Sequence, residues 1–403
     1  MADADPRRWR MLALLATAEL LGMAPWFAAT AVAPEFRELW TLSSGQSAWL
    51  TSIVQLGFVV GTLVAAVLNL ADVLPSRWYF GACAVLAGAA NGGLLIADDF
   101  ATGLALRFLT GFLLAGVYPP AMKMAATWFL SNRGVAIGTI VGALTVGKAL
   151  PYLVDALGGI RIGPVVGATS LSVVLAGVLV ALGYRDGPHA FARRPFSWRL
   201  VGEVARNREV RLVTAGYLGH MWELYAFWAW IAAFLAASVA AGSGAPGPRG
   251  VALAAFSVVA AGGIACVIGG RIADRIGRER LVIAALAASG SAALSVGLVF
   301  GLSFWIVVPL VMFWGMAVIA DSAQFSALVT ELAPGHAVGT ALTLQTSLGF
   351  LLTAVTIQLV PIMVSAIGWR WAFAMLAAGP MFGIFAITRL RRLRRLQPVS
   401  PHG

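Results

Sequence analysis

Long apolar runs follow one another along almost the whole chain, and they constrain its fold more than any other feature. Each has about 20 residues or more, the length of helix that crosses a hydrocarbon core about 30 Å thick. We identify twelve such runs, which cover residues 11–33, 46–69, 78–97, 100–127, 135–157, 163–184, 211–238, 250–270, 281–301, 303–326, 338–363 and 368–388. The sequence therefore predicts an all-α membrane protein with twelve transmembrane helices.

The composition agrees with this class. Of the 403 residues, 60% are hydrophobic and only 11% are charged, whereas a soluble domain carries about 25% charged residues. Cys83 and Cys266 both fall inside apolar runs, so we expect no disulfide framework. The first run imitates a secretory signal, but it is too long for a signal core and Pro34 follows the candidate cleavage site. We expect it to be the first transmembrane helix.

The placement of the basic residues sets the orientation. A net charge of +11 would also suit a nucleic-acid-binding protein, yet the basic residues gather at alternate ends of the runs. One side carries the arginines near residues 7–10, 77, 133, 185–211, 271–280 and 389–395, and the other carries Arg37, Arg161, Arg249 and Arg370. By the positive-inside rule, we expect both termini in the cytoplasm and the chain in the inner membrane of a bacterium-like cell. Anionic lipids of the inner face, rather than nucleic acid, are the expected partners.

The chain also repeats itself at an offset of 201 residues, because Glu19 aligns with His220 and Lys123 with Gln324. Long repeats of hydrophobic segments are typical of secondary transporters. The expected units are an N-terminal six-helix bundle (residues 1–184), a cytoplasmic linker (185–210) and a C-terminal six-helix bundle with a basic cytoplasmic tail (211–403). The linker is either a short helix lying on the inner leaflet or a solvated basic loop.

The loop after the eighth run carries the most specific motif. Residues 270–280 read GRIADRIGRER. Together with the twelve runs and the basic central linker, this loop resembles the major facilitator superfamily. The residues that match the family pattern are Gly270, Asp274, Arg275, Gly277, Arg278 and Arg280, while Glu279 departs from it. The resemblance implies two pseudo-symmetric six-helix bundles and transport by alternating access, and we expect a monomer.

This segment, Gly270 to Arg280, is called the gating loop below. Its glycines permit close helix approach and a tight turn, Asp274 suits a helix N-terminus or an arginine, and the arginines suit lipid phosphates. The resemblance implies that the loop holds the two bundles together in one state; the alternative is a simple topology anchor. An earlier loop keeps Asp72 and Arg77 but has lost the glycines, so we expect a weaker second gate there.

Ionisable residues inside the predicted spans are functional candidates, because a charge at the bilayer centre costs roughly 2.5–3.5 kcal/mol or more. They are Glu19, Arg107, Lys123, Lys148, Asp155, His220, Glu223 and Asp321. The resemblance implies that the first, fourth, seventh and tenth spans line a central cavity, and these spans carry most of the eight.

The acidic residues and the histidine are the candidates for proton coupling, namely Glu19, His220, Glu223 and Asp321. His220 and Glu223 are three residues apart and share a helix face, and a histidine beside a carboxylate exchanges a proton near neutral pH. Glu19 takes the position equivalent to His220 in the other half. The alternative for Glu223 is a structural pair with a basic residue.

The candidates for solute binding are Trp26, Arg107, Lys123, Lys148 and Gln324. Lys123 and Lys148 are the expected anion-binding groups. The alternatives are structural: Lys123 would neutralise a carboxylate, and Lys148 would pair with Asp155. Arg107 needs a carboxylate or carbonyls at its depth. The resemblance implies a proton-relay or gating role for it, and the alternative is a brace between the fourth and first spans.

These features predict a proton-coupled secondary transporter of a small anionic or zwitterionic solute. The alternative is a proton-driven exporter of hydrophobic or drug-like compounds, which the aromatic segment 216–230 favours. The exporter signature of the family is absent in its usual form, because Lys148 follows Gly147. The second and eighth spans lack the arginines of nitrate porters, and few spans carry the amides typical of sugar porters. We expect neither an enzyme nor a cofactor or metal, since no metal-ligand cluster, nucleophile triad or phosphate-binding loop is present.

Overall fold

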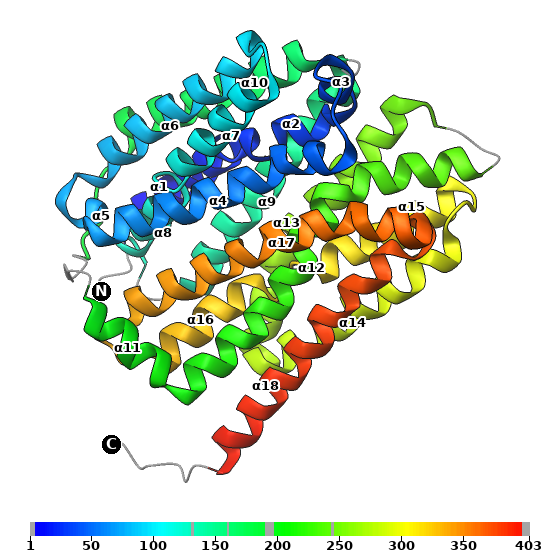
Figure 1. Cartoon of the computed structure of the whole chain (residues 1–403). Helices are drawn as coiled ribbons and strands as arrows, with labels where there is room; N and C mark the ends of the chain where they lie inside the picture. Colours follow the sequence, from blue (N-terminus) through cyan, green and yellow to red (C-terminus); the bar gives the residue numbers. More distant parts are fainter. Residues whose placement is uncertain (1–4, 130–132, 159–160, 190–196, 243–245, 397–403) are drawn as a thin grey trace.

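The computed structural model describes residues 5–129, 133–158, 161–189, 197–242 and 246–396, and the side chains of residues 71, 72, 133, 198 and 396 lie outside this description. Every regular element within these ranges is a helix (Figure 1). This follows from the apolar runs, because a helix satisfies its backbone N–H and C=O groups within its own segment, as a lipid environment requires.

The elements before the predicted linker are α1 (Arg7–Gly22), η1 (Ala24–Phe27), α2 (Ala28–Ala31), α3 (Ala33–Leu39), α4 (Ser44–Val67), α5 (Leu70–Val73), α6 (Ser76–Gly92), η2 (Gly93–Ile96), α7 (Phe100–Leu114), α8 (Tyr118–Ala126), α9 (Arg133–Gly158) and α10 (Ile162–Gly183). The later elements are α11 (Trp198–Arg206), α12 (Arg208–Ala241), α13 (Pro248–Ile276), α14 (Arg278–Val299), α15 (Phe304–Ala317), α16 (Ser322–Leu332), α17 (Val338–Ala372), η3 (Phe373–Ala377) and α18 (Ala378–Leu396). The helix α11 lies within the predicted linker. The division into two bundles at the linker stays a prediction.

Eleven helical segments of the described chain are long and apolar enough to cross a membrane. The last of them covers 58 residues, Val338–Arg395, which would measure about 87 Å if it were one straight helix. It turns instead at Gly368, whose φ of 75° is not helical, and α18 turns back at an angle from the end of α17 (Figure 1). The predicted all-α membrane class is confirmed, and the turn falls at the predicted boundary between the last two runs.

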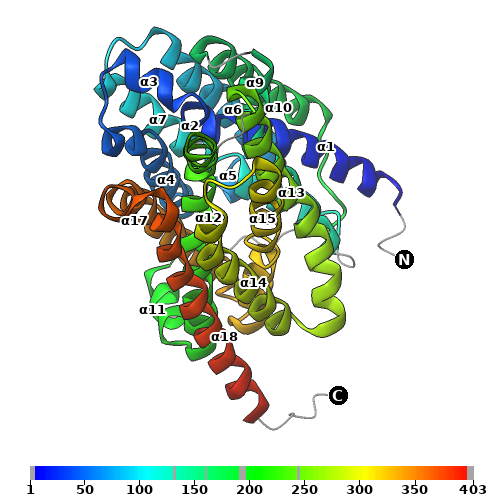
Figure 2. The ribbon, with the colours of Figure 1, turned by 90° about the vertical axis from the view of Figure 1, so that its right-hand side faces the viewer.

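Helices of the two halves gather on opposite sides of the molecule (Figures 1 and 2). The helices α1, α6, α7 and α10 pack together on one side, and α12, α14, α15 and α18 pack on the other. Between them α9 packs along α13 and α4 along α17. The N- and C-terminal ends of the chain lie at the same end of the molecule as α11 (Figure 1).

Large apolar side chains cover the outer surface. Ile96, Leu182 and Trp305 are 83%, 78% and 80% exposed. Such exposure is unfavourable in water but not against lipid chains, so these residues mark the lipid-facing surface.

The α9–α13 boundary is a close backbone contact. A Cβ atom added to Gly142 of α9 would lie 2.8 Å from the carbonyl oxygen of Gly263 on α13, and the reverse addition gives the same distance. Small residues allow two membrane helices to approach this closely. The backbones of the two halves therefore come into close contact here, with the Val146 side chain beside Gly263.

Candidate functional site

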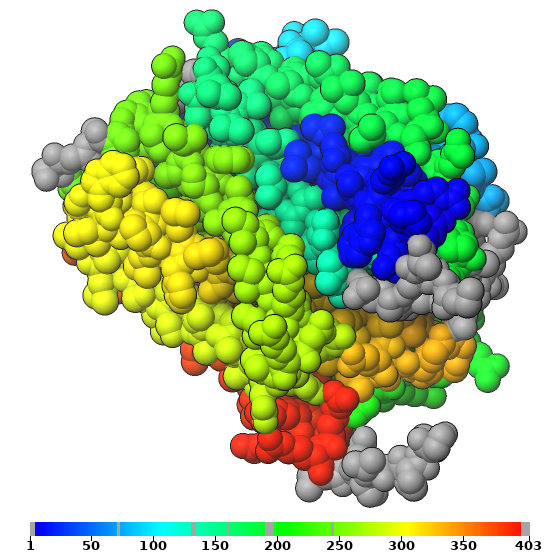
Figure 3. Space-filling view, turned by 180° about the vertical axis from the view of Figure 1, so that it is seen from behind, coloured from blue at the N-terminus to red at the C-terminus, as the bar shows by residue number. Residues whose placement is uncertain are grey.

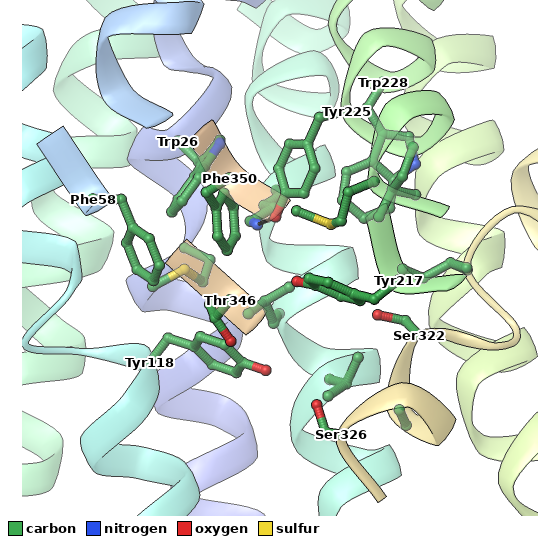
Figure 4. A pocket seen from close by; sticks show the side chains of 18 of the residues that line it. Trp26, Phe58, Tyr118, Tyr217, Tyr225, Trp228, Ser322, Ser326, Thr346 and Phe350 are labelled. Carbon is green, nitrogen blue, oxygen red and sulfur yellow. Dashed lines mark hydrogen bonds between the residues drawn. The ribbon is translucent and has the colours of Figure 1, made fainter. Parts of the chain in front are cut away.

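A cavity lies between the two halves, which we call the central cavity. Helices α4, α8, α9, α12, α16 and α17 and the η1 segment contribute to its wall. The space that the centres of water molecules can occupy in it is about 50 Å³. This is room for roughly three to five waters at 10–15 Å³ each. In Figure 4 its aromatic residues Trp26, Tyr225 and Trp228 lie towards one end, and Tyr118 and Ser326 lie towards the other. The cavity is narrow in this conformation, so a larger solute requires the halves to separate.

Lys148 is the only charged residue on the wall of this cavity in the part of the chain that the structure describes. Its side chain is 1% exposed. The ammonium nitrogen lies 3.9 Å from the ring centroid of Trp26, 4.5 Å from that of Tyr225, and 5.8 Å from those of Trp228 and Phe350. We call these four residues the aromatic cage. Their π faces stabilise the ammonium in a site from which water is largely excluded.

Two hydrogen bonds tie α9 to α12 beside the cage. Lys148 Nζ donates to the hydroxyl of Tyr225, and Tyr152 Oη donates to the backbone carbonyl of Trp228 at 3.2 Å. Lys148 does not pair with Asp155, whose Oδ1 is buried without a hydrogen bond. The structural pairing considered for Lys148 is thus replaced by a contact across the two halves.

Glu19 of α1 lies behind the cavity wall and is fully buried. Neither of its carboxylate oxygens has a hydrogen-bond partner. It interacts electrostatically with Lys148 and with Tyr118, both of which line the cavity, but it forms no ion pair within 4.0 Å. A buried carboxylate without a bonded partner is energetically costly as an anion, so this position favours a carboxyl group that can take up a proton.

Arg107 does not line the central cavity, and its hydrogen bonds are those expected of a brace, so its role in solute binding stays a prediction. It is fully buried and donates to the carbonyls of Pro25 at 2.8 Å, Trp26 at 2.5 Å and Leu50 at 3.1 Å, and to Asn91 Oδ1 at 3.1 Å. The η1 segment interrupts the helix at these carbonyls, and Pro25 removes an N–H donor. Arg107 therefore supplies donors to the carbonyl groups where the first span is broken, and it positions Trp26 of the aromatic cage.

His220 and Asp321 form a second buried site. Nδ1 of His220 lies 2.8 Å from Oδ1 of Asp321, and both side chains are 1% exposed. Asp321 precedes α16, where the tenth span is interrupted. Tyr217 stacks on the His220 ring with centroids 6.0 Å apart and separates it from the central cavity, whose wall includes Tyr217.

Glu223 has different neighbours from those predicted. Its carboxylate accepts hydrogen bonds from Ser289 Oγ and Trp314 Nε1, both at 2.7 Å, so it faces α14 and α15. It is not part of the cavity wall. His220 therefore contacts Asp321, whereas Glu223 links helices inside the second half. The coupling role of both residues stays a prediction.

The gating loop contains the predicted turn and two kinds of contact. Gly277 has φ +92° between α13 and α14, a conformation that favours glycine. A Cβ atom added to Gly134, in the first turn of α9 in the other half, would lie 3.8 Å from Oδ2 of Asp274. A Cβ on Gly270 would lie 3.9 Å from the Gly134 carbonyl oxygen. Asp274 thus approaches the N-terminal end of a neighbouring helix.

Arg278 contacts α16 of its own half. It donates to Glu331 at 2.6 Å and to Gln324 at 2.8 Å. Gln324 was predicted to bind solute, but it does not line the central cavity and lies beside the gating loop. The loop therefore holds α14 to α16 as well as approaching α9.

The other predicted residues lie away from the cavity wall. Lys123 on α8 is half-buried, and Arg275 is exposed. Arg77 is exposed and places its guanidinium 5.1 Å from the Trp78 ring centroid. The side chain of Asp72 lies outside the described residues.

Several wall residues were not predicted, notably Tyr217, Tyr225, Trp228 and Phe350. Tyr217, Met221, Leu224, Tyr225 and Trp228 recur at helical spacing on α12 and form the face towards the cavity. His220 and Glu223 lie on the adjoining faces. Within the described residues, no group of three or more His, Cys, Asp or Glu side chains is placed to hold a metal ion.

Comparison with known proteins gives one consistent likeness. The family model described as Major Facilitator Superfamily matches residues 15–357. Two crystal structures of a bacterial homologue of the human lysosomal transporter Spinster, inward-facing in unoccupied and occupied forms, have TM-scores of 0.73 and 0.72 at 16% sequence identity. Each match covers 99% of this chain and 100% of the other. No curated protein matches the chain.

Proposed function

The chain belongs to the Major Facilitator Superfamily and is a secondary transporter, and we propose that it carries an organic anion with an apolar body together with a proton. The observation that carries this proposal is Lys148, a buried ammonium on the cavity wall inside the aromatic cage. An anion entering the cavity meets this single positive charge, where water competes little with the ion pair.

The remainder of the wall supports an apolar or aromatic body for the solute. Aromatic rings surround Lys148, and Met23, Leu144 and Met221 add aliphatic surface. Polar groups other than Lys148 are hydroxyls, among them Tyr118, Ser322 and Thr346 (Figure 4), and the indole N–H groups of Trp26 and Trp228, which have no hydrogen-bond partner among the described residues. A few directional groups on an apolar wall are typical of sites for small organic ligands.

The position of Glu19 supports coupling to a proton. In the empty cavity the charges of Glu19 and Lys148 balance. When a solute carboxylate binds Lys148, an ionised Glu19 would be left as an uncompensated buried charge, which is strongly unfavourable. Uptake of a proton by Glu19 restores neutrality. The empty and loaded carriers then both present a neutral centre, and one proton moves with each monovalent anion.

The His220–Asp321 pair is the alternative site for the coupling proton. It is buried and close to the cavity, but Tyr217 lies between it and the solute space. A second candidate function is proton-driven export of hydrophobic compounds, which the predominantly apolar wall favours. Both alternatives are separated by transport measurements.

The test is transport by the purified chain in proteoliposomes. A panel of labelled aromatic and aliphatic monocarboxylates is screened by counterflow, and hits are measured under an imposed pH gradient. We expect accumulation that follows the pH gradient and does not change when potassium and valinomycin set the membrane potential. Accumulation of neutral hydrophobic compounds but no carboxylate would contradict the proposed solute class. Accumulation that depends on the membrane potential would contradict electroneutral coupling.

A further inference from the structure

A second hollow lies where the gating loop meets the C-terminal end of α18. Ile276, Glu279 and Arg280 line it from the end of α13 and the start of α14, and Arg391, Arg394 and Arg395 line it from α18. Its volume is about 360 Å³ for the centres of water molecules. In Figure 3 the red end of α18 lies against the yellow-green segment that contains this part of the chain. We call it the arginine hollow.

The charges of the arginine hollow are unbalanced. Four guanidinium groups face one carboxylate, that of Glu279, which accepts a hydrogen bond from Arg394. The start of α14 adds the positive end of a helix dipole. Like charges gathered in one hollow repel one another, so an anion that enters it is attracted by the excess charge.

Guanidinium groups match phosphate better than they match a spherical ion, because their N–H donors form parallel hydrogen bonds to two oxygens. The hollow also lies next to lipid-facing surface. Ile268, Ile272 and Ile276 are 48%, 39% and 42% exposed at four-residue spacing on α13, and Ile276 lines the hollow. Acyl chains lying along these isoleucines would bring a headgroup to the arginines.

We propose that the arginine hollow binds the phosphate group of an anionic ligand, with a phospholipid headgroup as the source that its position favours. Bound phosphate would neutralise arginines of α14 and α18 together, and it would compete with Glu279 for Arg394. It would thereby fix the start of α14, which adjoins the turn at Gly277 in the gating loop. This site is independent of the solute and proton sites of the central cavity.

The experiment measures binding of labelled phosphatidylglycerol to the full-length chain in phosphatidylcholine nanodiscs. Arg391→Gln with Arg395→Gln removes two charges from the hollow. Arg389→Gln with Arg392→Gln removes the same charge from the same helix outside the hollow, and is the matched control. We expect the chain with Arg391→Gln and Arg395→Gln to bind phosphatidylglycerol at least about tenfold more weakly than the unchanged chain, since each change removes a charge-assisted contact. The control should bind less than about twofold more weakly. Equal losses in the two pairs, or no loss in either, would overturn the proposal.

A variant expected to gain binding guards against misfolding as the cause of any loss. Glu279→Gln removes the competing carboxylate and should tighten lipid binding by roughly twofold to tenfold. Two further probes identify the ligand chemistry. Oleate, an anionic lipid without phosphate, should bind weakly, and equal binding of oleate would overturn phosphate recognition. Binding of inorganic phosphate without binding of phosphatidylglycerol would overturn the lipid as the source.

Discussion

Lys148 of α9 donates a hydrogen bond to Tyr225 of α12, so the charged residue of the central cavity is bonded across the two halves of the transporter. Tyr152 adds a parallel bond to the Trp228 carbonyl one turn further along α9. An anion that binds Lys148 competes with the Tyr225 hydroxyl for the same ammonium group. We infer that solute binding loosens one of the contacts that hold α9 against α12.

Replacing Lys148 with Gln should remove most of the affinity for the anion. Loss of one partner of a buried charge pair costs about 2–5 kcal/mol, which corresponds to roughly 30-fold to 4,000-fold in the dissociation constant. The measurement is ligand-induced thermal stabilisation or counterflow of the carboxylate identified in the screen. Lys123→Gln is the matched control, because Lys123 is not on the cavity wall. The affinity of this variant for the anion should change by less than about threefold. Unchanged binding by Lys148→Gln would remove this residue from the solute site.

Replacing Glu19 with Gln should abolish accumulation driven by a pH gradient while exchange of solute across the membrane continues. The amide cannot take up a proton, yet it leaves the loaded cavity neutral, as protonated Glu19 would. The measurement compares pH-driven uptake with counterflow in the same proteoliposomes. Wild-type accumulation by this variant would show that another group carries the proton.

His220→Gln should retain pH-driven accumulation but destabilise the chain. It leaves Asp321 buried without its partner, and breaking a buried pair costs about 3–5 kcal/mol. The double variant with Asp321→Asn removes both ionisable side chains and should recover most of the stability, measured by denaturant unfolding. If His220→Gln loses accumulation and Glu19→Gln keeps it, the coupling proton belongs to the His220–Asp321 pair.

Glu223→Ala should lower stability without uncoupling transport. It leaves the buried N–H of Trp314 without an acceptor, at about 1–3 kcal/mol, and leaves Ser289 Oγ only the Leu286 carbonyl at 3.3 Å. Glu223→Gln keeps an acceptor oxygen and should be the milder change. Thermal unfolding and pH-driven uptake are measured on both. Loss of uptake in a stable, folded Glu223→Gln protein would restore Glu223 as a coupling residue.

Gly142→Ala should disturb the contact between α9 and α13. The added Cβ would lie 2.8 Å from the Gly263 carbonyl, so the helices must separate, at about 1–3 kcal/mol for overpacking. We expect a lower unfolding temperature and slower transport. Gly167→Ala on α10 is the control, because a Cβ there meets no atom within 4 Å and alanine is the better helix former. Equal effects of the two changes would show that the close approach has no special role.

The all-α membrane class and the glycine turn of the gating loop were accessible to prediction because they depend on local properties. Apolar length determines a span, and a glycine followed by a new helix marks a turn. Gly277 and the boundary near Gly368 lie where the sequence pattern placed them. These features need no knowledge of which helix packs on which.

The contacts of buried polar residues were harder to predict, because each depends on a helix distant in the sequence. Spacing on α12 places His220 and Glu223 on one side, yet each bonds to a different neighbour, Asp321 in one case and Trp314 in the other. The periodic residues Tyr217, Tyr225 and Trp228 did mark the cavity face of the same helix. The aromatic segment 216–230 indicated a hydrophobic cargo, but its spacing alone does not distinguish a cavity face from a lipid-facing or core face.

Arg107 does not line the central cavity, but it positions the ring of Trp26, which does. It does so by donating hydrogen bonds to the carbonyls of Pro25 and Trp26. Selectivity for cargo can therefore change through the fourth span without any alteration of a residue that touches cargo. Variation among relatives at this depth would be read as structural drift, although it would reshape the recognition surface from behind.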